Sequence, residues 1–255
     1  MQIVTISGYK GGTGKTTIAA LLGVAAVQAG LRTATLDLDR NTRNLSNFLT
    51  LRRPTGLPTP DHVMFMDMGG SGSGGGQLEN LANLARMDGY ELLIIDTSSG
   101  HHDDLYEAHL LADVILTPMN ESPADLHGLF TPPGARAAPR TNYRDMIDTA
   151  RFDRRRSGRP EPQWHVCLNR ISPTPTKIGS VVESLLSGIA AAARFGGIWR
   201  VRDRVAHKSI SLEGRTVLDP LPPGQKLTMS EMSGRSEIRA LLALVGEPQH
   251  MYAAA

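Results

Sequence analysis

The stretch Gly8-Tyr-Lys-Gly-Gly-Thr-Gly-Lys-Thr-Thr17 decides the fold of this chain. An apolar run from Ile3 to Ile6 precedes it, and an alanine- and leucine-rich run from Ile18 to Ala29 follows it. This order of strand, tight loop and helix is typical of a phosphate-binding loop. The glycines let the backbone aim its amides at one point, to which the helix adds the positive end of its dipole. We therefore predict that the loop binds a polyphosphate.

The side chains of the loop have roles that follow from their reach and charge. Lys15 is predicted to lie along the β- and γ-phosphates, and Thr16 to offer its hydroxyl to Mg²⁺. Thr17 is placed to hydrogen-bond the α-phosphate from the first turn of the helix. The other loop residues predicted to bind the nucleotide are Gly11, Gly12, Thr13 and Gly14.

Carboxylates follow two predicted strands. The strand Thr33 to Asp37 runs into Asp37-Leu38-Asp39, and the apolar run Tyr90 to Ile95 ends in Asp96. The carboxyl ends of strands in an open α/β sheet face the phosphate site, so Asp96 is predicted to reach the Mg²⁺ shell. Asp39 is also suited to cap a helix from Thr42 onward, a role that does not exclude catalysis.

Apolar strands alternate with helices along the whole chain, which predicts one α/β domain over residues 1–255. Its sheet should be mainly parallel and twisted, with helices on both faces. The predicted strands are Gln2 to Ser7, Thr33 to Asp37, Tyr90 to Ile95, Asp113 to Pro118, Trp164 to Asn169, Ile198 to Val201 and Val217 to Leu221. The predicted helices are Lys15 to Ala29, Leu45 to Leu51, Gln77 to Met87, a helix ending at Leu111, Tyr143 to Arg155, Ser180 to Arg194 and one capped by Ser233 that ends at Val245.

Two segments interrupt this pattern. Gly69 to Gly76 is a glycine-serine run that predicts a flexible surface loop. Residues 131–162 form a proline- and arginine-rich excursion that carries Arg154-Arg155-Arg156. These three arginines either contact DNA or only face solvent and keep the excursion soluble. His101 to Asp104 does not predict a metal site, because adjacent side chains at a helix start point in different directions.

Composition predicts a soluble, cytoplasmic protein. The single cysteine, Cys167, excludes an internal disulfide framework, which favours a reducing compartment. No run of about 18 apolar residues could span a bilayer. Met1 leads directly into a predicted strand, so no signal peptide is expected.

The net charge of +2 is unevenly distributed. Residues 132–215 carry 16 Lys and Arg against 7 Asp and Glu, a balance of +9, whereas the rest carries 11 against 18, a balance of −7. The basic part either meets nucleic acid or is merely a solvated surface. A cluster within nine residues is suited to contact the DNA phosphate backbone without sequence choice. It consists of Arg200, Arg202, Arg204 and Lys208.

The second lysine of the loop, Lys10, indicates which kind of nucleotide-binding loop this is. Lys-Gly-Gly-x-Gly-Lys-Thr resembles the deviant phosphate-binding loop of the ParA/MinD family of ATPases. The resemblance implies that ATP and Mg²⁺ bind here and that Lys10 reaches the partner's phosphates across a homodimer that sandwiches the nucleotides. It also implies that Asp39 orders the attacking water and that Asp37 supports Mg²⁺.

Further roles and some departures follow from the same resemblance. Asn169 and Arg170 would meet the adenine. The chain departs from the family pattern at Arg40-Asn41, where Pro-Gln is usual. It departs again at Thr97-Ser98-Ser99-Gly100, which replaces a proline-containing switch segment but keeps its glycine.

Later segments are similar to the MipZ branch of this family. They are Leu116-Thr-Pro-Met-Asn-Glu-Ser122, Val166-Cys-Leu-Asn-Arg170, Arg202-Asp-Arg-Val205, Thr216-Val-Leu-Asp219 and Glu237-Ile-Arg-Ala-Leu-Leu242. The resemblance implies a slow ATPase whose ATP-bound dimer associates with the nucleoid through non-specific DNA binding. Its implied partners are a ParB-like protein and the division protein FtsZ, which it inhibits.

The sequence leaves three other functions as alternatives to this one. The first is a ParA-type plasmid or chromosome partition ATPase. The second is a module that holds ATP without hydrolysing it, which the presence of Asp39 disfavours. The third is a MinD-like membrane switch, which is disfavoured because Met251 to Ala255 lacks a basic amphipathic helix.

Overall fold

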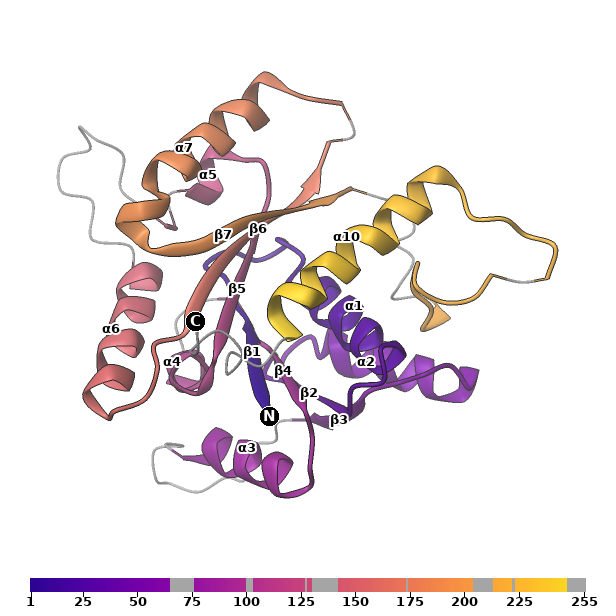
Figure 1. Ribbon diagram of the computed structural model, residues 1–255, viewed down its shortest axis with the longest axis horizontal. Helices are drawn as coiled ribbons and strands as arrows, with labels where there is room; N and C mark the ends of the chain where they lie inside the picture. The colour runs from indigo at the N-terminus through magenta and orange to yellow at the C-terminus, as the bar shows by residue number, and fades with distance from the viewer. Residues whose placement is uncertain are drawn as a thin grey trace, which may run out of the picture.

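A seven-stranded sheet forms the centre of the molecule (Figure 1). The computed structural model describes residues 1–64, 76–99, 103–126, 128–129, 142–172, 174–203, 213–221 and 223–246. The strands are β1 (Gln2–Ile6), β2 (Thr33–Asp37), β3 (Asp61–Met64), β4 (Leu92–Asp96), β5 (Val114–Met119), β6 (Gln163–Ile171) and β7 (Phe195–Arg202). Their spatial order is β3-β2-β4-β1-β5-β6-β7, and all neighbouring pairs are parallel. The predicted α/β architecture is confirmed.

Helices cover both faces of this sheet (Figure 1). They are α1 (Lys15–Gln28), α2 (Asn44–Arg52), α3 (Gln77–Met87), α4 (Asp103–Leu111), α5 (Pro123–Leu126), α6 (Asn142–Arg156), α7 (Lys177–Ala193) and α10 (Met229–Gly246), with a short 3-10 helix, η1 (Arg53–Thr55), after α2. Val4 and Ile6 point to one face, where they share a core with α1, α2 and α10. Ile3 points to the other face, which α3 and α4 cover. Farther along that face, α4, α6 and α7 share a core with β5 and β6.

The strand order places the phosphate-binding loop at the point where the sheet changes direction. From β1 the chain crosses to β2, beyond β4, whereas from β4 it crosses back to β5 on the other side of β1. Ligands of open α/β sheets bind outside the carboxyl ends of strands at such a point. The register aligns Ile6 with Asp96 and Asp37 with Asp96, so both aspartates lie beside the start of the loop.

One predicted strand is wrong. Val217 to Leu221 does not join the sheet but forms a turn, in which the Thr216 amide donates to Asp219 Oδ2 at 2.6 Å. The Asp219 amide donates back to the Thr216 carbonyl at 3.1 Å. Val217 and Leu218 are buried between α1 and α10, which explains why they looked like strand residues.

Strand β3 was not predicted. Pro54, Pro58 and Pro60 precede it closely and favour irregular structure, and the strand is only four residues long. It lies at the edge of the sheet, where short strands next to proline are tolerated. Its addition places His62 beside Thr35 of β2.

The start of α10 also differs from the prediction. The helix begins at Met229, because Thr228 and Glu231 form a capping box. The Glu231 amide donates to Thr228 Oγ1 at 3.2 Å, and the Thr228 amide donates to Glu231 Oε2 at 2.8 Å. Ser233 therefore lies inside the helix, where its hydroxyl donates to the Met229 carbonyl at 3.0 Å.

The excursion and α7 agree with the prediction in part. The predicted helix of the excursion is α6, whereas residues 130–141 lie outside the described residues. So do residues 69–75 of the glycine-serine run, as well as His101 and His102. Helix α7 is buried only in part, since Val182 and Leu186 are buried but Val181 and Leu185 are exposed.

Candidate nucleotide-binding site

The loop between β1 and α1 has the backbone shape that phosphate binding needs. Gly12 and Gly14 adopt φ angles of 77° and 90°, in the left-handed region that favours glycine. A Cβ atom at Gly14 would lie 2.1 Å from Asn169 Nδ2, so a larger residue would clash there. Helix α1 begins immediately afterwards at Lys15, and its first amides face the loop.

Lys15 lies inside the site rather than in solvent. Its side chain is buried, and its ammonium group donates to the Lys10 carbonyl at 3.3 Å. Burial lowers the pKa of Lys15, whereas the negative charges of Asp96 and Asp39 oppose this shift. The predicted phosphate lysine and two of the three predicted carboxylates therefore share one electrostatic environment.

Asp96 is buried without the partners that a carboxylate needs. It is fully inaccessible, and neither carboxylate oxygen accepts a hydrogen bond of normal geometry from the described residues. Burial raises its pKa to about 8, although the neighbouring Thr16 hydroxyl and Lys15 oppose the rise. Buried charges of this kind are otherwise paired or coordinate a metal. The site thus fits a cation, with Thr16 and Asp96 as the groups that face it.

Asp37 is held by hydrogen bonds on both carboxylate oxygens. Oδ1 accepts the Asp39 amide at 2.9 Å. Oδ2 accepts the Ser46 amide at 3.0 Å and the Ser46 hydroxyl at 2.9 Å. Asp37 therefore also caps the first turn of α2, and its orientation beside Asp96 is fixed. Within the described residues no three His, Cys, Asp or Glu side chains gather into a metal cluster, so protein groups would supply only part of a coordination shell. Such a site suits Mg²⁺, which usually keeps waters and binds substrate phosphates.

Asp39 closes a turn at the mouth of the site. Its Oδ1 accepts the amides of Asn41 and Thr42, at 3.1 and 3.0 Å, and its Oδ2 accepts the Thr42 hydroxyl at 2.8 Å. Burial raises the pKa of Asp39, but these hydrogen bonds outweigh burial and lower it overall. Asp39 is not the helix cap, because α2 begins at Asn44 and Arg43 occupies its cap position.

Lys10 contacts a residue that sequence reasoning missed. Its ammonium group lies 2.7 Å from Asp125 Oδ1, in an ion pair within the same chain. The Lys10 side chain is 48% exposed, whereas the Asp125 side chain is 2% exposed. Asp125 Oδ2 also accepts the Asn120 amide at 2.9 Å, which ties this residue of α5 to the end of β5. The only sequence signal was Pro123, a typical first residue of a helix, two positions earlier.

Asn169 and Arg170 lie against the loop, at the end of β6. Asn169 Nδ2 donates to the Thr13 carbonyl at 2.8 Å, and an Arg170 guanidinium nitrogen donates to the Gly12 carbonyl at 3.0 Å. Arg170 has a φ of 56°, which marks a bulge in the pairing of β6 with β7, between Asn169 and Ile171. Their predicted contact with adenine stays a prediction, and what the structure adds is that both support the loop backbone.

The predicted switch segment, which follows β4, begins next to the loop. The Thr97 amide and hydroxyl both donate to the Ile6 carbonyl, at 3.2 and 3.1 Å. Ser99 faces Gly11, since its hydroxyl oxygen would lie 3.5 Å from a Cβ atom placed there. Gly100 lies outside the described residues.

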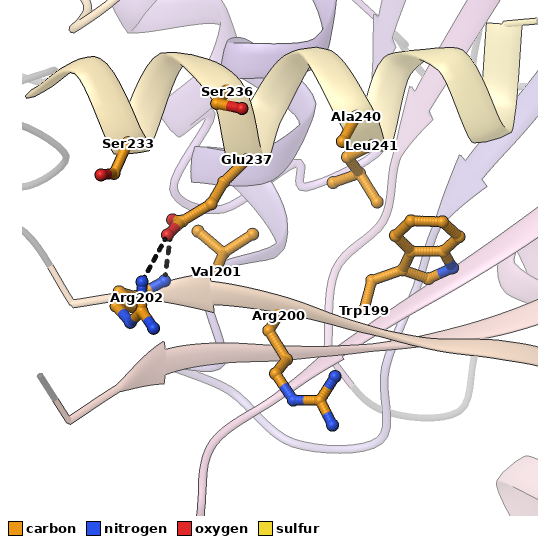
Figure 2. A pocket seen from close by; sticks show the side chains of 9 residues that line it. All are labelled: Trp199, Arg200, Val201, Arg202, Ser233, Ser236, Glu237, Ala240 and Leu241. Atoms are coloured by element: carbon orange, nitrogen blue, oxygen red, sulfur yellow. Dashed lines mark hydrogen bonds and ion pairs between the residues drawn. The ribbon is translucent and has the colours of Figure 1, made fainter. Parts of the chain in front are cut away.

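Two of the four predicted DNA-binding residues line a groove between β7 and α10, with a volume of about 370 Å³ (Figure 2). Arg202 approaches Glu237, whose carboxylate accepts from the Arg202 guanidinium at 3.5 Å and from its amide at 3.2 Å. Arg200 points away from α10 in this view and forms an ion pair with Glu183. Arg204 and Lys208 lie outside the described residues.

The arginine run of the excursion is not a continuous basic surface. Arg154 is buried, donates to the Ala112 carbonyl and forms an ion pair with Asp113 at 3.3 Å. Both alternatives for this residue, DNA contact and solvation, are wrong. Nearby Arg151 is buried as well and donates to the carbonyls of Ala193 and Arg194. These arginines tie α6 to the sheet and to α7.

Comparison with known proteins identifies the family. The model of a family described as ATPase MipZ matches residues 2–248. This chain belongs to the MipZ family of ATPases. Over 50 residues it is 52% identical to a putative septum site-determining protein MinD of Guillardia theta, a match that covers 20% of this chain and about a fifth of that relative's length, 19%.

Solved structures share the fold over the whole chain. The MinC:MinD cell division protein complex of Aquifex aeolicus superposes with a TM-score of 0.62 at 17% identity, covering 97% of both chains. The septum site-determining protein MinD of Pyrococcus horikoshii, complexed with Mg-ADP, gives 0.61 at 17% identity, covering 100% of this chain and 99% of that one. Among the described residues, no helix is long and apolar enough to cross a membrane.

Proposed function

We propose that this MipZ-family ATPase is a slow nucleotide switch that binds ATP and Mg²⁺ in the loop Gly8–Thr17 and dimerises in the ATP state. The observation that carries the proposal is the buried Asp96 carboxylate, which has no normal hydrogen bond from the described residues. It lies beside Thr16 and Lys15, where a cation and a polyphosphate would compensate its charge. The Mg-ADP bound to the MinD of Pyrococcus horikoshii supports the same ligand class.

The proposed roles in binding follow from the geometry of the loop. Lys15 and the amides of residues 11–17 bind the phosphates, while Asn169 and Arg170 hold the loop in shape and face the adenine. Thr16 and Asp96 hold the cation, and Asp37 supports it from the adjacent strand. Bound Mg²⁺ neutralises charge that develops on the phosphates during transfer.

Hydrolysis requires a positioned water and, besides Mg²⁺, a positively charged side chain near the phosphates. Asp39 is the proposed water-ordering carboxylate, because hydrogen bonds keep it ionised at the mouth of the site. Lys10 is the proposed lysine that reaches the partner's phosphates in the dimer. In the single chain it is bound to Asp125, so dimer formation would exchange one negative partner for another. This exchange gives the switch two defined states.

The proposed output is the placement of the division site. The ATP-bound dimer would bind chromosomal DNA non-specifically through Arg200, Arg202, Arg204 and Lys208, meet a ParB-like partner and inhibit FtsZ. The family match supports this output over a partition role, and the MinD of Aquifex aeolicus forms a complex with the division protein MinC. The protein would then be associated with the nucleoid in the cytoplasm.

Sedimentation of FtsZ filaments tests this output. Purified filaments are formed with GTP, and the Asp39→Ala variant is added after loading with ATP or with ADP. We expect that only the ATP-loaded variant moves FtsZ from the pellet to the supernatant. Lys15→Ala, which should not bind ATP, is the control and should leave the filaments intact. Filaments that are indifferent to the ATP-loaded variant would reject FtsZ as the target and favour a partition ATPase that moves DNA cargo.

A further inference from the structure

A chain of hydrogen bonds connects the edge strand β3 to the predicted magnesium site. His62 Nδ1 lies 2.9 Å from Thr35 Oγ1, and His62 Nε2 lies 2.9 Å from Ser46 Oγ. The Ser46 hydroxyl in turn contacts Asp37 Oδ2 at 2.9 Å. This series of hydrogen bonds therefore joins β2, β3 and α2, and it ends on the carboxylate of Asp37, which neighbours Asp96.

The direction of the hydrogen bonds follows from the groups involved. The Ser46 hydroxyl donates its single proton to the Asp37 carboxylate. The Ser46 oxygen can then only accept from His62, which requires a proton on Nε2. Burial lowers the pKa of His62, although the negative charge of Asp37 opposes this shift, so the ring is neutral near pH 7. Nδ1 is then an acceptor for the Thr35 hydroxyl, which the ring shares with the Asp61 carbonyl at 3.1 Å.

This arrangement removes the freedom of the Ser46 hydroxyl. Without His62 the hydroxyl could rotate and donate to another acceptor, such as a carbonyl one turn earlier in the helix. With His62 in place it donates to the Asp37 oxygen that also accepts the Ser46 amide. Asp37 thus receives two donors on Oδ2 and the Asp39 amide on Oδ1, which hold it fixed beside Asp96.

We propose that His62 is a positioning residue for the magnesium site, acting through Ser46 to orient the Asp37 carboxylate toward the cation. The inference rests on the proposed function, because it requires that Mg²⁺ binds beside Asp96. Groups one step removed from a metal usually change metal affinity by about 10- to 100-fold when they are lost. A purely structural histidine would instead affect the attachment of β3 without changing the affinity for Mg²⁺.

The test measures Mg²⁺ binding directly. A fluorescent ATP analogue with an N-methylanthraniloyl group is bound to the protein, and Mg²⁺ is titrated from zero while the fluorescence is followed. For His62→Phe we expect the half-saturating Mg²⁺ concentration to rise about tenfold. Affinity for the analogue in the presence of EDTA should not change, because no phosphate contact is lost. Thermal melting of each variant confirms that it is folded.

Four further variants separate positioning from stability. Val63→Thr is the matched control on β3, since Val63 is exposed, and it should leave the Mg²⁺ titration unchanged. His62→Gln keeps an N–H donor and should recover part of the affinity. Ser46→Ala should weaken Mg²⁺ binding as His62→Phe does, and the double variant should be no worse than Ser46→Ala alone. Should His62→Phe fail to fold, Ser46→Ala and His62→Gln still decide the question.

An unchanged Mg²⁺ titration in folded His62→Phe, or in Ser46→Ala, would overturn the inference. Asp96→Asn separates this failure from a failure of the proposed function. If Asp96→Asn abolishes the Mg²⁺ response while His62→Phe leaves it intact, only the role of His62 is wrong. If Asp96→Asn also responds normally to Mg²⁺, the magnesium site itself is wrongly placed.

Discussion

Asp96 is a single residue that lowers the stability of the folded protein and is proposed to bind a cation. Its pKa is raised to about 8 by burial, so the folded protein without ligand binds a proton that the unfolded chain releases near pH 4. Stability therefore falls as the pH rises from about 4 to about 8. Such a cost is typical of a residue kept for binding rather than for folding.

Asp96→Asn should reverse this balance. In the absence of ligand we expect the variant to be more stable than the native protein at pH 7.5, by about 1–2 kcal/mol, and to lose the steep dependence on pH. Mg²⁺ with ATP should then stabilise the native protein but not the variant. Urea denaturation at pH 5.5 and 7.5, with and without Mg-ATP, measures both effects. A variant that is less stable at pH 7.5 would contradict the raised pKa.

Asp125 is a second residue whose substitution can be tested, because it should change how readily the ATP-loaded protein dimerises. Its ion pair with the half-exposed Lys10 stabilises the single chain, and exposed pairs contribute about 0.2–1 kcal/mol. Asp125→Asn should therefore lower the protein concentration at which half of the ATP-loaded protein is dimeric, by up to about fivefold. Sedimentation velocity over a concentration series measures this midpoint. A higher midpoint would show that Asp125 supports the dimer instead.

At the scale of elements, the buried pair of Arg52 and Asp219 connects α2 to the turn before α10. Two guanidinium nitrogens of Arg52 donate to the Asp219 oxygens at 2.7 and 2.6 Å, and both side chains are almost inaccessible. Burial raises the pKa of Asp219, but the hydrogen bonds from Arg52 and Thr216 lower it overall. The pair thus contributes stability above about pH 4 that is lost as the pH falls further.

Asp219→Asn should destabilise the fold by about 3–5 kcal/mol at pH 7, because it leaves the buried Arg52 charge uncompensated. The loss should shrink below pH 4, where the native aspartate also becomes protonated. Glu161→Gln is a suitable control, since Glu161 pairs with Arg194 at the surface, and it should cost less than about 1 kcal/mol. Urea denaturation of the three proteins checks the difference, and equal stability of all three would contradict it.

The contact between Arg202 and Glu237, in the groove between β7 and α10, leads to a prediction about the affinity for DNA. Glu237 partly neutralises Arg202, so Glu237→Gln should raise the affinity for a non-specific DNA duplex. The slope of log affinity against log salt should steepen by about one unit. Glu79→Gln on α3 makes the same charge change on an exposed residue elsewhere. Fluorescence anisotropy with a labelled duplex measures both variants, and an equal gain in each would point to net charge alone.

The elements also show what the sequence could and could not predict. The loop, Lys15 and Asp96 were predictable because their positions depend on local sequence patterns. These patterns are a glycine-rich motif and an apolar run that ends in a carboxylate. Asp125 and His62 were not, because their contacts join residues 115 and 16 positions apart in the chain. The strand predicted at Val217 failed for a similar reason, since tertiary burial made a turn look like part of the sheet.

At the scale of the whole molecule, we propose that ATP assembles two copies of this chain. Lys10, Asp39 and the loop glycines lie at one mouth, outside the carboxyl ends of the strands, where a second copy could close over the nucleotide. The chain-internal ion pair of Lys10 describes the state that this closure would replace. Family, fold and site geometry are consistent with such a switch.

Sedimentation velocity of the Asp39→Ala variant tests this claim most directly. The variant should bind ATP but hydrolyse it too slowly to leave the ATP state during the run. With Mg-ATP we predict that it sediments as a dimer, whereas with Mg-ADP, or as Lys15→Ala with ATP, the protein should sediment as a monomer. A monomer in saturating Mg-ATP, or a dimer that persists without nucleotide, would contradict the account.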